Sequence, residues 1–188
     1  MQISKVKKYI PNLLTILRIL LVFPFIFFVF KDNFGSALFV FIIAAVSDFF
    51  DGYLARKWKT ESMFGKIADP LADKILLISS YILLALISAI PLYLAIIVVS
   101  KDILIICTIV LCKVFKVHLK FSPLISSKIN TTIQLIYIIL VLACKCFYIN
   151  VALAIMLCSI VVSITTIFCA AEYVKKYYWI KDAVCKAK

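Results

Sequence analysis

The sequence predicts an all-α integral membrane protein with six transmembrane helices and a short N-terminal interfacial segment. Hydrophobic residues make up 65% of the 188 residues and charged residues 16%, whereas a soluble domain carries about half apolar and about a quarter charged residues. Apolar runs of roughly 20 residues, the length with which a helix crosses the hydrocarbon core of a bilayer, follow one another along the chain. Most cations lie between alternate runs, as expected for a protein oriented in a membrane.

The elements follow in order from a short basic segment, QISKVKKYIPN, which suits a stretch lying along the membrane interface. Pro11, Pro91 and Pro123 fit the starts of the first, fourth and fifth helices, where a missing backbone N–H costs nothing. Gly35 and Ser36 follow the loop KDNF and fit the start of the second. The spans are expected near residues 10–30, 35–56, 66–88, 91–112, 123–144 and 149–172. Because no repeat or Gly/Ser-rich linker separates them, residues 1–188 are expected to form a single membrane domain.

Polar residues enter two of the predicted spans. They are Lys66, Asp69, Asp73 and Lys74 in the third span and Ser126, Ser127, Lys128, Asn130, Thr131, Thr132 and Gln134 in the fifth. Lipid cannot satisfy such groups, so they should face the interior of the bundle or a water-filled cavity. We therefore expect a polar chamber near one membrane surface, lined by the starts of spans three and five and the end of span two.

The net charge of +12 is distributed unevenly between the two sides of the predicted bundle. Two cations, Lys31 and Lys145, lie in the loops of one side, against fifteen on the other. The fifteen are Lys5, Lys7, Lys8, Arg56, Lys57, Lys59, Lys66, Lys113, Lys116, Lys120, Lys175, Lys176, Lys181, Lys186 and Lys188. The positive-inside rule places both termini and the loop between spans two and three in the cytoplasm. The charge is thus expected to orient the chain and to attract anionic lipid head groups, with no nucleic-acid partner. An Arg- and Ser-rich transit peptide is not evident, which favours the bacterial inner membrane.

Five of the nine acidic residues, Glu61 and four aspartates, stand in the stretch SDFFDGYLARKWKTESMFGKIADPLADK. Asp48 and Asp51 are three residues apart at the end of span two, and Asp69 and Asp73 are four apart at the start of span three. Each pair therefore shares one face of its helix. Carboxylates at membrane depth indicate a functional site, and an all-oxygen ligand set favours Mg²⁺, Mn²⁺ or Ca²⁺ over zinc. The pattern predicts a two-metal site for a phosphate-containing substrate.

Small residues and one arginine lie between the two acidic pairs. Gly52, Ala55 and Gly65 let helices approach closely or let a ligand lie against the backbone. Arg56 supplies a planar donor that suits phosphate. Together with the acids, these residues indicate a bound substrate that contains pyrophosphate.

The pattern Asp48-x2-Asp51-Gly52-x2-Ala55-Arg56-x8-Gly65-x3-Asp69-x3-Asp73 resembles, position by position, the signature of the CDP-alcohol phosphatidyltransferases. All of its fixed positions are filled over 26 residues, and the expected topology extends the resemblance to nearly the whole chain. The resemblance implies that two divalent cations, Mg²⁺ or Mn²⁺, are held by Asp48, Asp51, Asp69 and Asp73. It further implies that the cytidine diphosphate part of CDP-diacylglycerol is received by Gly52, Ala55, Arg56 and Gly65. Asp73 is implied as the general base that deprotonates the acceptor hydroxyl, which attacks the β-phosphorus while CMP leaves. A homodimer is also implied.

The acceptor is suggested by segments outside this pattern. IPNLLTILRI and ADPLADK resemble the phosphatidylglycerolphosphate synthases and the CMP-forming cardiolipin synthases. Both branches have an arginine followed by an acid in span four, where this chain has Lys101 and Asp102 and so loses the bidentate fork. FSPLISSKINTTIQ is more similar to cardiolipin synthases of mitochondrial type, although Lys128-x2-Thr131-x2-Gln134 occurs in similar form in both. We favour glycerol 3-phosphate over phosphatidylglycerol as the acceptor.

Lys101 and Lys128 are the candidates for binding the acceptor's phosphate, because an intramembrane lysine needs an anionic partner. The alternative for Lys101 is an ion pair with Asp102 or another acid. Asn12 and Thr15 are candidates for contact with the nucleotide, and they fit a capping or packing role in the first helix equally well.

A cation transporter or channel is the alternative of a different class. A transport site lies near the midplane of the membrane, often on broken helices in repeated halves. Here the acids lie near the expected cytoplasmic ends of two helices and no repeat is visible. The sequence therefore favours an enzyme of phospholipid biosynthesis.

Overall fold

The computed structural model describes residues 17–58, 65–114, 125–149 and 151–186, with side chains described for 17–47, 74–106, 126–149 and 151–175. The described residues form helices and the turns between them, so the predicted all-α class is confirmed for this part of the chain. Asn12 and Thr15 lie outside the described residues. The helices are Leu17–Phe30, α2 (Phe34–Trp58), α3 (Gly65–Leu86), α4 (Leu92–Val114), α5 (Ile125–Cys146) and α6 (Ala152–Lys186).

The helices match the predicted order, and α6 differs most in extent. The last span was expected to end near residue 172, whereas α6 continues to Lys186. Its last part, AEYVKKYYWIKDAVCK, holds no glycine or proline, the two residues that most disfavour a helix interior. A helix makes its hydrogen bonds within itself, so it continues where the apolar sequence ends.

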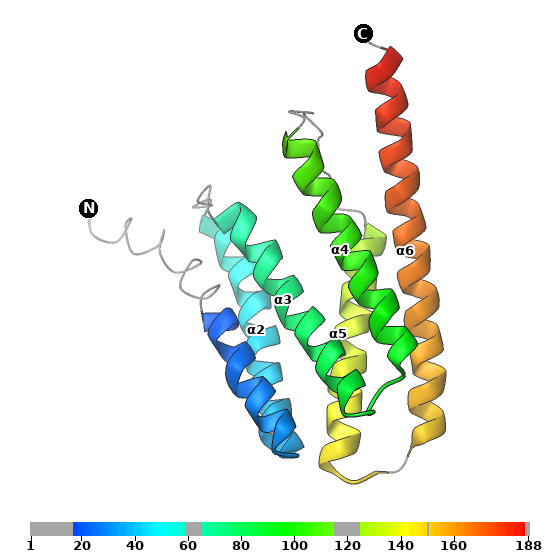
Figure 1. The fold of residues 1–188 in the computed structure, drawn as a ribbon. Coiled ribbons are helices and arrows are strands. Elements are labelled where there is room, and N and C mark those ends of the chain that lie inside the picture. The colour runs from blue at the N-terminus through cyan, green and yellow to red at the C-terminus, as the bar shows by residue number, and fades with distance from the viewer. Residues whose placement is uncertain (1–16, 59–64, 115–124, 150, 187–188) are drawn as a thin grey trace, which may run out of the picture.

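The helices lie alongside one another in a bundle (Figure 1). α2 packs on α5, α5 on α6, α6 on α4 and α4 on α3, while α3 also contacts α5. The helix Leu17–Phe30 packs against α2 through Phe25 and Phe41, whose ring centroids lie 5.7 Å apart. The end of α2 and the start of α3 lie at the same end of the bundle (Figure 1).

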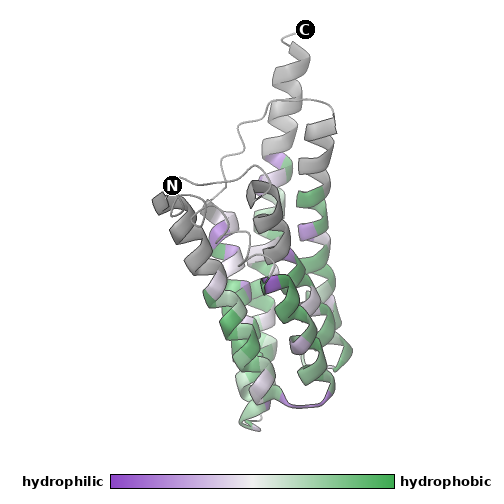
Figure 2. Cartoon of the chain, turned by 90° about the vertical axis from the view of Figure 1, so that its left-hand side faces the viewer, coloured by the Kyte–Doolittle hydropathy of each residue, from purple (hydrophilic) through white to green (hydrophobic). Residues whose placement is uncertain are grey.

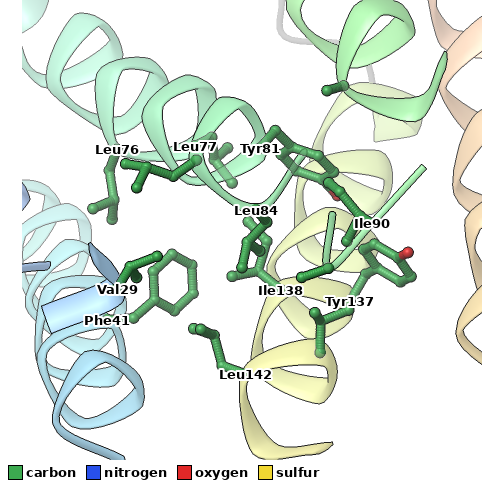
Figure 3. Packing of buried hydrophobic residues seen from close by; sticks show 14 of the residues in the cluster. Val29, Phe41, Leu76, Leu77, Tyr81, Leu84, Ile90, Tyr137, Ile138 and Leu142 are labelled. Atoms are coloured by element: carbon green, nitrogen blue, oxygen red, sulfur yellow. The ribbon is translucent and has the colours of Figure 1, made fainter. Parts of the chain in front are cut away.

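The centre of the bundle is filled by apolar side chains from several helices (Figure 3). Phe41 of α2, Leu77 of α3 and Leu142 of α5 are fully buried. Tyr81 of α3 and Tyr137 of α5 stack with their ring centroids 6.4 Å apart and an interplanar angle of 12°. Such aromatic pairs contribute about 0.5–1.5 kcal/mol beyond the burial of their area. The core therefore fixes α3 against α5 below the acidic motif.

Three helices end in the same hydrogen-bonded turn, each around a residue with a left-handed backbone. Asp32, Ser88 and Tyr148 have φ angles of 53°, 55° and 54°. In each turn the N–H of the left-handed residue bonds the carbonyl three residues back, and the next N–H bonds the carbonyl five residues back. This is the Schellman motif, in which the left-handed position is usually glycine. The chain has 3 glycines, and none occupies these positions.

The exterior of the bundle is apolar, unlike that of a soluble bundle, and several polar side chains are buried beside the apolar core. Large apolar side chains such as Phe39, Leu86 and Leu153 are 66–73% exposed. Polar side chains are buried instead, and they are Arg18, Ser80, Lys101, Asp102, Asn130, Gln134, Ser159, Ser163 and Thr166. Figure 2 shows apolar residues along most of the described length of the helices, with strongly polar residues toward the upper end and in the lower loops. An apolar exterior with polar and charged groups kept inside the bundle is typical of helices surrounded by lipid.

Length and composition allow two helical segments of the described chain to cross a membrane. They are Ser126–Cys146 and Ala152–Lys175, with 21 and 24 residues. The shorter apolar segments Leu17–Phe30, Phe34–Ser47 and Lys74–Leu86 are the parts of three further helices whose side chains are described. Asp48 and Asp51 lie within α2 (Phe34–Trp58), and Asp69 and Asp73 lie within the first part of α3 (Gly65–Leu86).

Candidate active site

The two aspartate pairs lie in helical register with buried stripes of their helices. On α2, the buried residues Ala37, Phe41 and Ala44 recur every three or four positions, and positions 48, 51 and 55 continue this spacing. On α3, the buried residues Leu77, Tyr81 and Leu84 recur in the same way, and positions 73 and 69 continue the spacing toward the start of the helix. Residues at such intervals share one helix face.

The remaining motif positions fall on the same two helices. Gly52, Ala55 and Arg56 lie in the last two turns of α2, and Gly65 is the first residue of α3. The ends of these helices adjoin each other where the chain passes from α2 to α3 (Figure 1). Within the part of the chain whose side chains are described, no three His, Cys, Asp or Glu side chains gather into a metal-binding group. The acidic motif itself lies outside that part.

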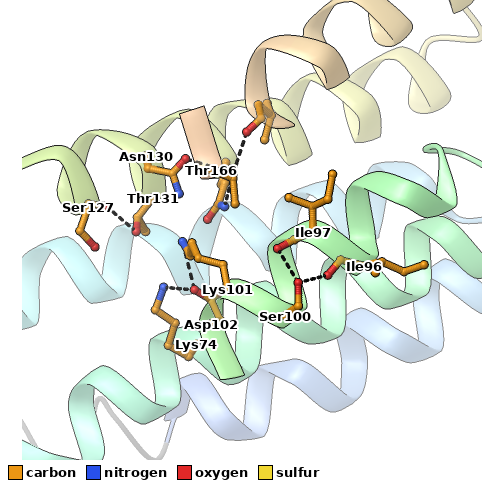
Figure 4. Close-up of polar contacts among 12 residues, drawn as sticks. Lys74, Ile96, Ile97, Ser100, Lys101, Asp102, Ser127, Asn130, Thr131 and Thr166 are labelled. Carbon is orange, nitrogen blue, oxygen red and sulfur yellow. Dashed lines mark hydrogen bonds and ion pairs between the residues drawn. The ribbon is translucent and has the colours of Figure 1, made fainter. Parts of the chain in front are cut away.

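Directly after the motif, three charged side chains from two helices form a buried cluster (Figure 4). The Lys74 ammonium on α3 donates to Oδ1 of Asp102 on α4 at 2.8 Å. The Lys101 Nζ lies 3.1 Å from the same oxygen. The side chains of Lys101 and Asp102 are 1% and 0% exposed, and that of Lys74 is 15% exposed. Two cations thus share one carboxylate inside the bundle.

The hydrogen-bonding capacity of this cluster is only partly used within the described residues. The Lys101 ammonium is in ion-pair range of Asp102, yet the angle is unsuited to a hydrogen bond, and its Nζ has no hydrogen-bond partner there. The Oδ2 atom of Asp102 also lacks one. An ammonium has three donors, and buried polar groups are costly when they stay unpaired. The cluster therefore has donors available for a further anionic group.

Polar side chains of α5 and α6 lie beside the cluster (Figure 4). Gln134 Nε2 donates to Thr166 Oγ1 at 3.2 Å, and Thr166 Oγ1 lies 3.1 Å from Asn130 Oδ1. Asn130 Nδ2 and Gln134 Oε1 have no hydrogen-bond partner in the described residues. These residues come from α5, as expected for the predicted polar chamber, together with a contribution from α6 that the sequence did not suggest.

The structure separates the two lysines that were predicted to bind the acceptor. Lys101 is buried beside Asp102, whereas Lys128 is exposed on α5. The buried positions of α5 at this level are Asn130 and Gln134, and Lys128 lies outside their stripe. The ion pair of Lys101 with Asp102, given above as the alternative reading of Lys101, is present in the structure.

Lys74, Arg18 and Glu172 were not selected from the sequence as site residues. Lys74 is the cation directly after Asp73, and its position in ADPLADK was the available signal. Arg18 lies in an apolar run and is 1% exposed, and a charge within such a run is itself a signal. Glu172 accepts a hydrogen bond from Ser126, which ties α6 to the start of α5. Nothing in the sequence indicates that partner.

A helical bundle with an apolar exterior, charged and polar groups buried inside it and aspartates toward one end of two helices defines a protein of membrane type. The chain belongs to the CDP-alcohol phosphatidyltransferase family, because the sequence profile of that family matches residues 8–167. The predicted family is thereby confirmed.

Relatives from two branches of the family are similar to this chain. A CMP-forming cardiolipin synthase of Rattus norvegicus is 34% identical over 154 residues, covering 73% of this chain and 51% of the relative. A CDP-diacylglycerol–glycerol-3-phosphate 3-phosphatidyltransferase of Cereibacter sphaeroides is 47% identical over 79 residues, covering 40% and 36%. The protein of that name from Escherichia coli K12 is 44% identical over 79 residues, covering 39% and 42%. The chain spans about half the length, or less, of these curated relatives.

Proposed function

We propose that the protein transfers the phosphatidyl group of CDP-diacylglycerol to glycerol 3-phosphate, releasing CMP and forming phosphatidylglycerolphosphate. The observation that carries this proposal is the complete acidic motif at the adjoining ends of α2 and α3, in register with the stripes that face the core. The family match adds the reaction class. The name of the Cereibacter sphaeroides relative, which is 47% identical over the 79 aligned residues, adds the acceptor.

The donor set of the motif fits divalent cations. Four carboxylates without histidine or cysteine suit Mg²⁺ or Mn²⁺, and Asp48, Asp51, Asp69 and Asp73 are the residues that would hold two such ions. When bound, the ions supply positive charge that stabilises the pyrophosphate and the leaving group. Gly52, Ala55, Arg56 and Gly65 are proposed to bind the cytidine diphosphate part, with Asn12 and Thr15 as further candidates.

The chemistry proposed for the chain's own residues is a proton transfer with positioning of the substrates. Asp73 accepts the proton of the acceptor hydroxyl. As it does so, the hydroxyl oxygen forms a bond to the β-phosphorus, and the bond from that phosphorus to the oxygen that leaves with CMP breaks. General base catalysis of this kind contributes about 10²–10⁴-fold. Positioning and electrostatic stabilisation supply most of the remainder in phosphoryl-type transfers.

Lys101 and Lys128 remain the proposed acceptor ligands, and the structure supports Lys101 more directly. Its ammonium is buried with unused donors, whereas Lys128 is exposed on α5. The second candidate acceptor is phosphatidylglycerol, as in the CMP-forming cardiolipin synthases. The observation favouring it is the longer match, over 154 residues, with the rat protein of that name.

We also propose that all six helices span the membrane, with both termini and the active site facing the cytoplasm of a bacterial cell. We further propose that the chain acts as one domain in a homodimer. The apolar side chains on the outside of the bundle support the membrane location. The excess of cations on one side supports the orientation. The homodimer rests on the family resemblance.

The function is tested with purified protein, CDP-diacylglycerol and Mg²⁺ or Mn²⁺, with each acceptor supplied separately. CMP release that requires glycerol 3-phosphate, with phosphatidylglycerolphosphate as the lipid product, is the expected result. Release that requires phosphatidylglycerol and yields cardiolipin overturns the choice of acceptor. A folded protein that releases no CMP when either acceptor is supplied contradicts the proposed reaction.

A further inference from the structure

The buried cluster of Lys74, Lys101 and Asp102 holds more positive than negative charge. Two ammonium groups lie 2.8 and 3.1 Å from a single oxygen, Asp102 Oδ1. One carboxylate cannot neutralise both, and an uncompensated charge inside a protein is strongly unfavourable. A bound anion removes this cost.

Lys101, the most deeply buried cation of the cluster, has unused hydrogen-bond donors. Lys101 Nζ has no hydrogen-bond partner in the described residues, although it is within 3.1 Å of Asp102 Oδ1. Lys74 uses one of its three donors on Asp102 and is 15% exposed, so part of its side chain remains accessible. Ammonium groups on two different helices therefore converge, with spare donors, close to one point.

The position of the cluster relates it to the proposed reaction. Lys74 follows Asp73, the proposed general base, in α3. Lys101 and Asp102 lie in α4, the helix that packs on α3. A group held by Lys74 and Lys101 thus lies close to the backbone of Asp73 without needing the exposed Lys128.

We propose that Lys74 is a ligand of the acceptor's phosphate and that Asp102 is a positioning residue, holding Lys74 and Lys101 together so that they bind a phosphomonoester. A phosphomonoester presents three terminal oxygens and up to two negative charges, whereas the phosphodiester of a lipid such as phosphatidylglycerol presents two oxygens and one charge. Because Asp102 cancels one of the two ammonium charges, the number of donors decides between them: Lys101 and Lys74 have spare donors for three terminal oxygens, which favours the former. This inference rests on the proposed function and narrows its acceptor to a small phosphomonoester.

The test measures CMP release against the concentration of glycerol 3-phosphate and, separately, of CDP-diacylglycerol. Lys74→Gln keeps much of the side chain and should raise the KM for glycerol 3-phosphate by roughly 10- to 100-fold, the loss of one charged hydrogen bond. The KM for CDP-diacylglycerol should change less than about twofold, because the nucleotide lies on other residues. Lys74→Arg, which keeps the charge, should recover most of the affinity. Lys31→Gln, an exposed lysine at the far end of the bundle, is the matched control and should change neither value.

A second measurement does not depend on turnover. Binding of radiolabelled glycerol 3-phosphate to the purified protein without CDP-diacylglycerol should be lost in Lys74→Gln and kept in Lys31→Gln. Asp102→Asn should weaken the same binding and lower kcat as well, since the two lysines lose their shared partner. If Asp102→Asn does not fold, Lys74→Gln alone decides, because Lys74 is partly exposed.

The outcomes separate this inference from the proposed function. Wild-type CMP release that needs glycerol 3-phosphate, together with an unchanged KM and unchanged binding in a folded Lys74→Gln protein, overturns the inference alone and leaves the cluster as a structural ion pair. Wild-type protein that releases no CMP with any of the acceptors overturns the proposed function itself. Wild-type protein that uses phosphatidylglycerol and ignores glycerol 3-phosphate overturns the phosphomonoester assignment.

Discussion

Lys74 and Asp102 stand 28 residues apart in the sequence and are joined by a 2.8 Å hydrogen bond between the ammonium and Oδ1. The contact links the first part of α3, directly after the acidic motif, to the middle of α4. It also brings Lys101 within 3.1 Å of the same oxygen. The interior of the bundle therefore carries a cationic group beside the helix that holds the proposed base.

Removing the proposed base should stop the reaction while preserving the protein. We expect Asp73→Asn to lower kcat for CMP release by about 10²–10⁴-fold, because an amide cannot accept the proton of the acceptor hydroxyl. Asp32→Asn serves as the control, since Asp32 is an exposed acid in the turn before α2 and takes no part in the site. Activity of Asp73→Asn close to that of wild type would show that another group takes the proton.

Removing divalent cations should abolish activity reversibly. After dialysis against a chelator we expect CMP release to fall at least about 100-fold, since bound ions contribute several kcal/mol of charge stabilisation. Adding Mg²⁺ or Mn²⁺ back should restore it. The metal dependence is measured at saturating CDP-diacylglycerol and glycerol 3-phosphate, and full CMP release by protein shown to be metal-free contradicts the proposed role of the four aspartates.

Truncating a core leucine should destabilise the bundle far more than truncating a neighbour on its surface. Leu84 is 0% exposed and lies among the core residues of Figure 3, whereas Leu86 is 68% exposed. Leu84→Ala should lower the free energy of unfolding by about 2–5 kcal/mol, because it leaves a cavity. Leu86→Ala should cost less than about 0.5 kcal/mol, as surface substitutions do. Reversible unfolding in mixed micelles measures both, and equal costs argue against this packing.

Relieving a left-handed helix end should stabilise the protein. Ser88 has a φ of 55° in the turn after α3, and glycine adopts this conformation without the steric cost of a side chain. Ser88→Gly should raise the free energy of unfolding by roughly 0.5–1 kcal/mol. Ser79→Gly, within α3, is the matched control and should lower it by about 0.5 kcal/mol, because glycine is the weaker helix former there. A loss of stability in Ser88→Gly contradicts the assigned backbone conformation.

Much of the fold was predictable because the relevant signals are local. The apolar runs predicted helices at the positions where the structure has them, and the helix ends at Trp58, Leu86 and Cys146 fall within two residues of those expected. The end of α6 was not predicted. An apolar run indicates only how much of a helix lipid can surround, and α6 continues through polar residues to Lys186. The acidic motif was equally readable, because its spacing within two helices carries the pattern.

The sequence by itself determined the helical class, the family and the residues of the proposed metal and nucleotide site, since each depends on residues close together in the chain. Only the tertiary structure decided which polar side chains meet: that Asp102 pairs with Lys74 as well as with Lys101, that Thr166 of α6 joins Asn130 and Gln134, and that Lys128 stays exposed. The physical reason is that such contacts depend on how each helix is rotated about its axis and shifted against its neighbours. Those rotations follow from the packing of the whole core, which no single segment contains.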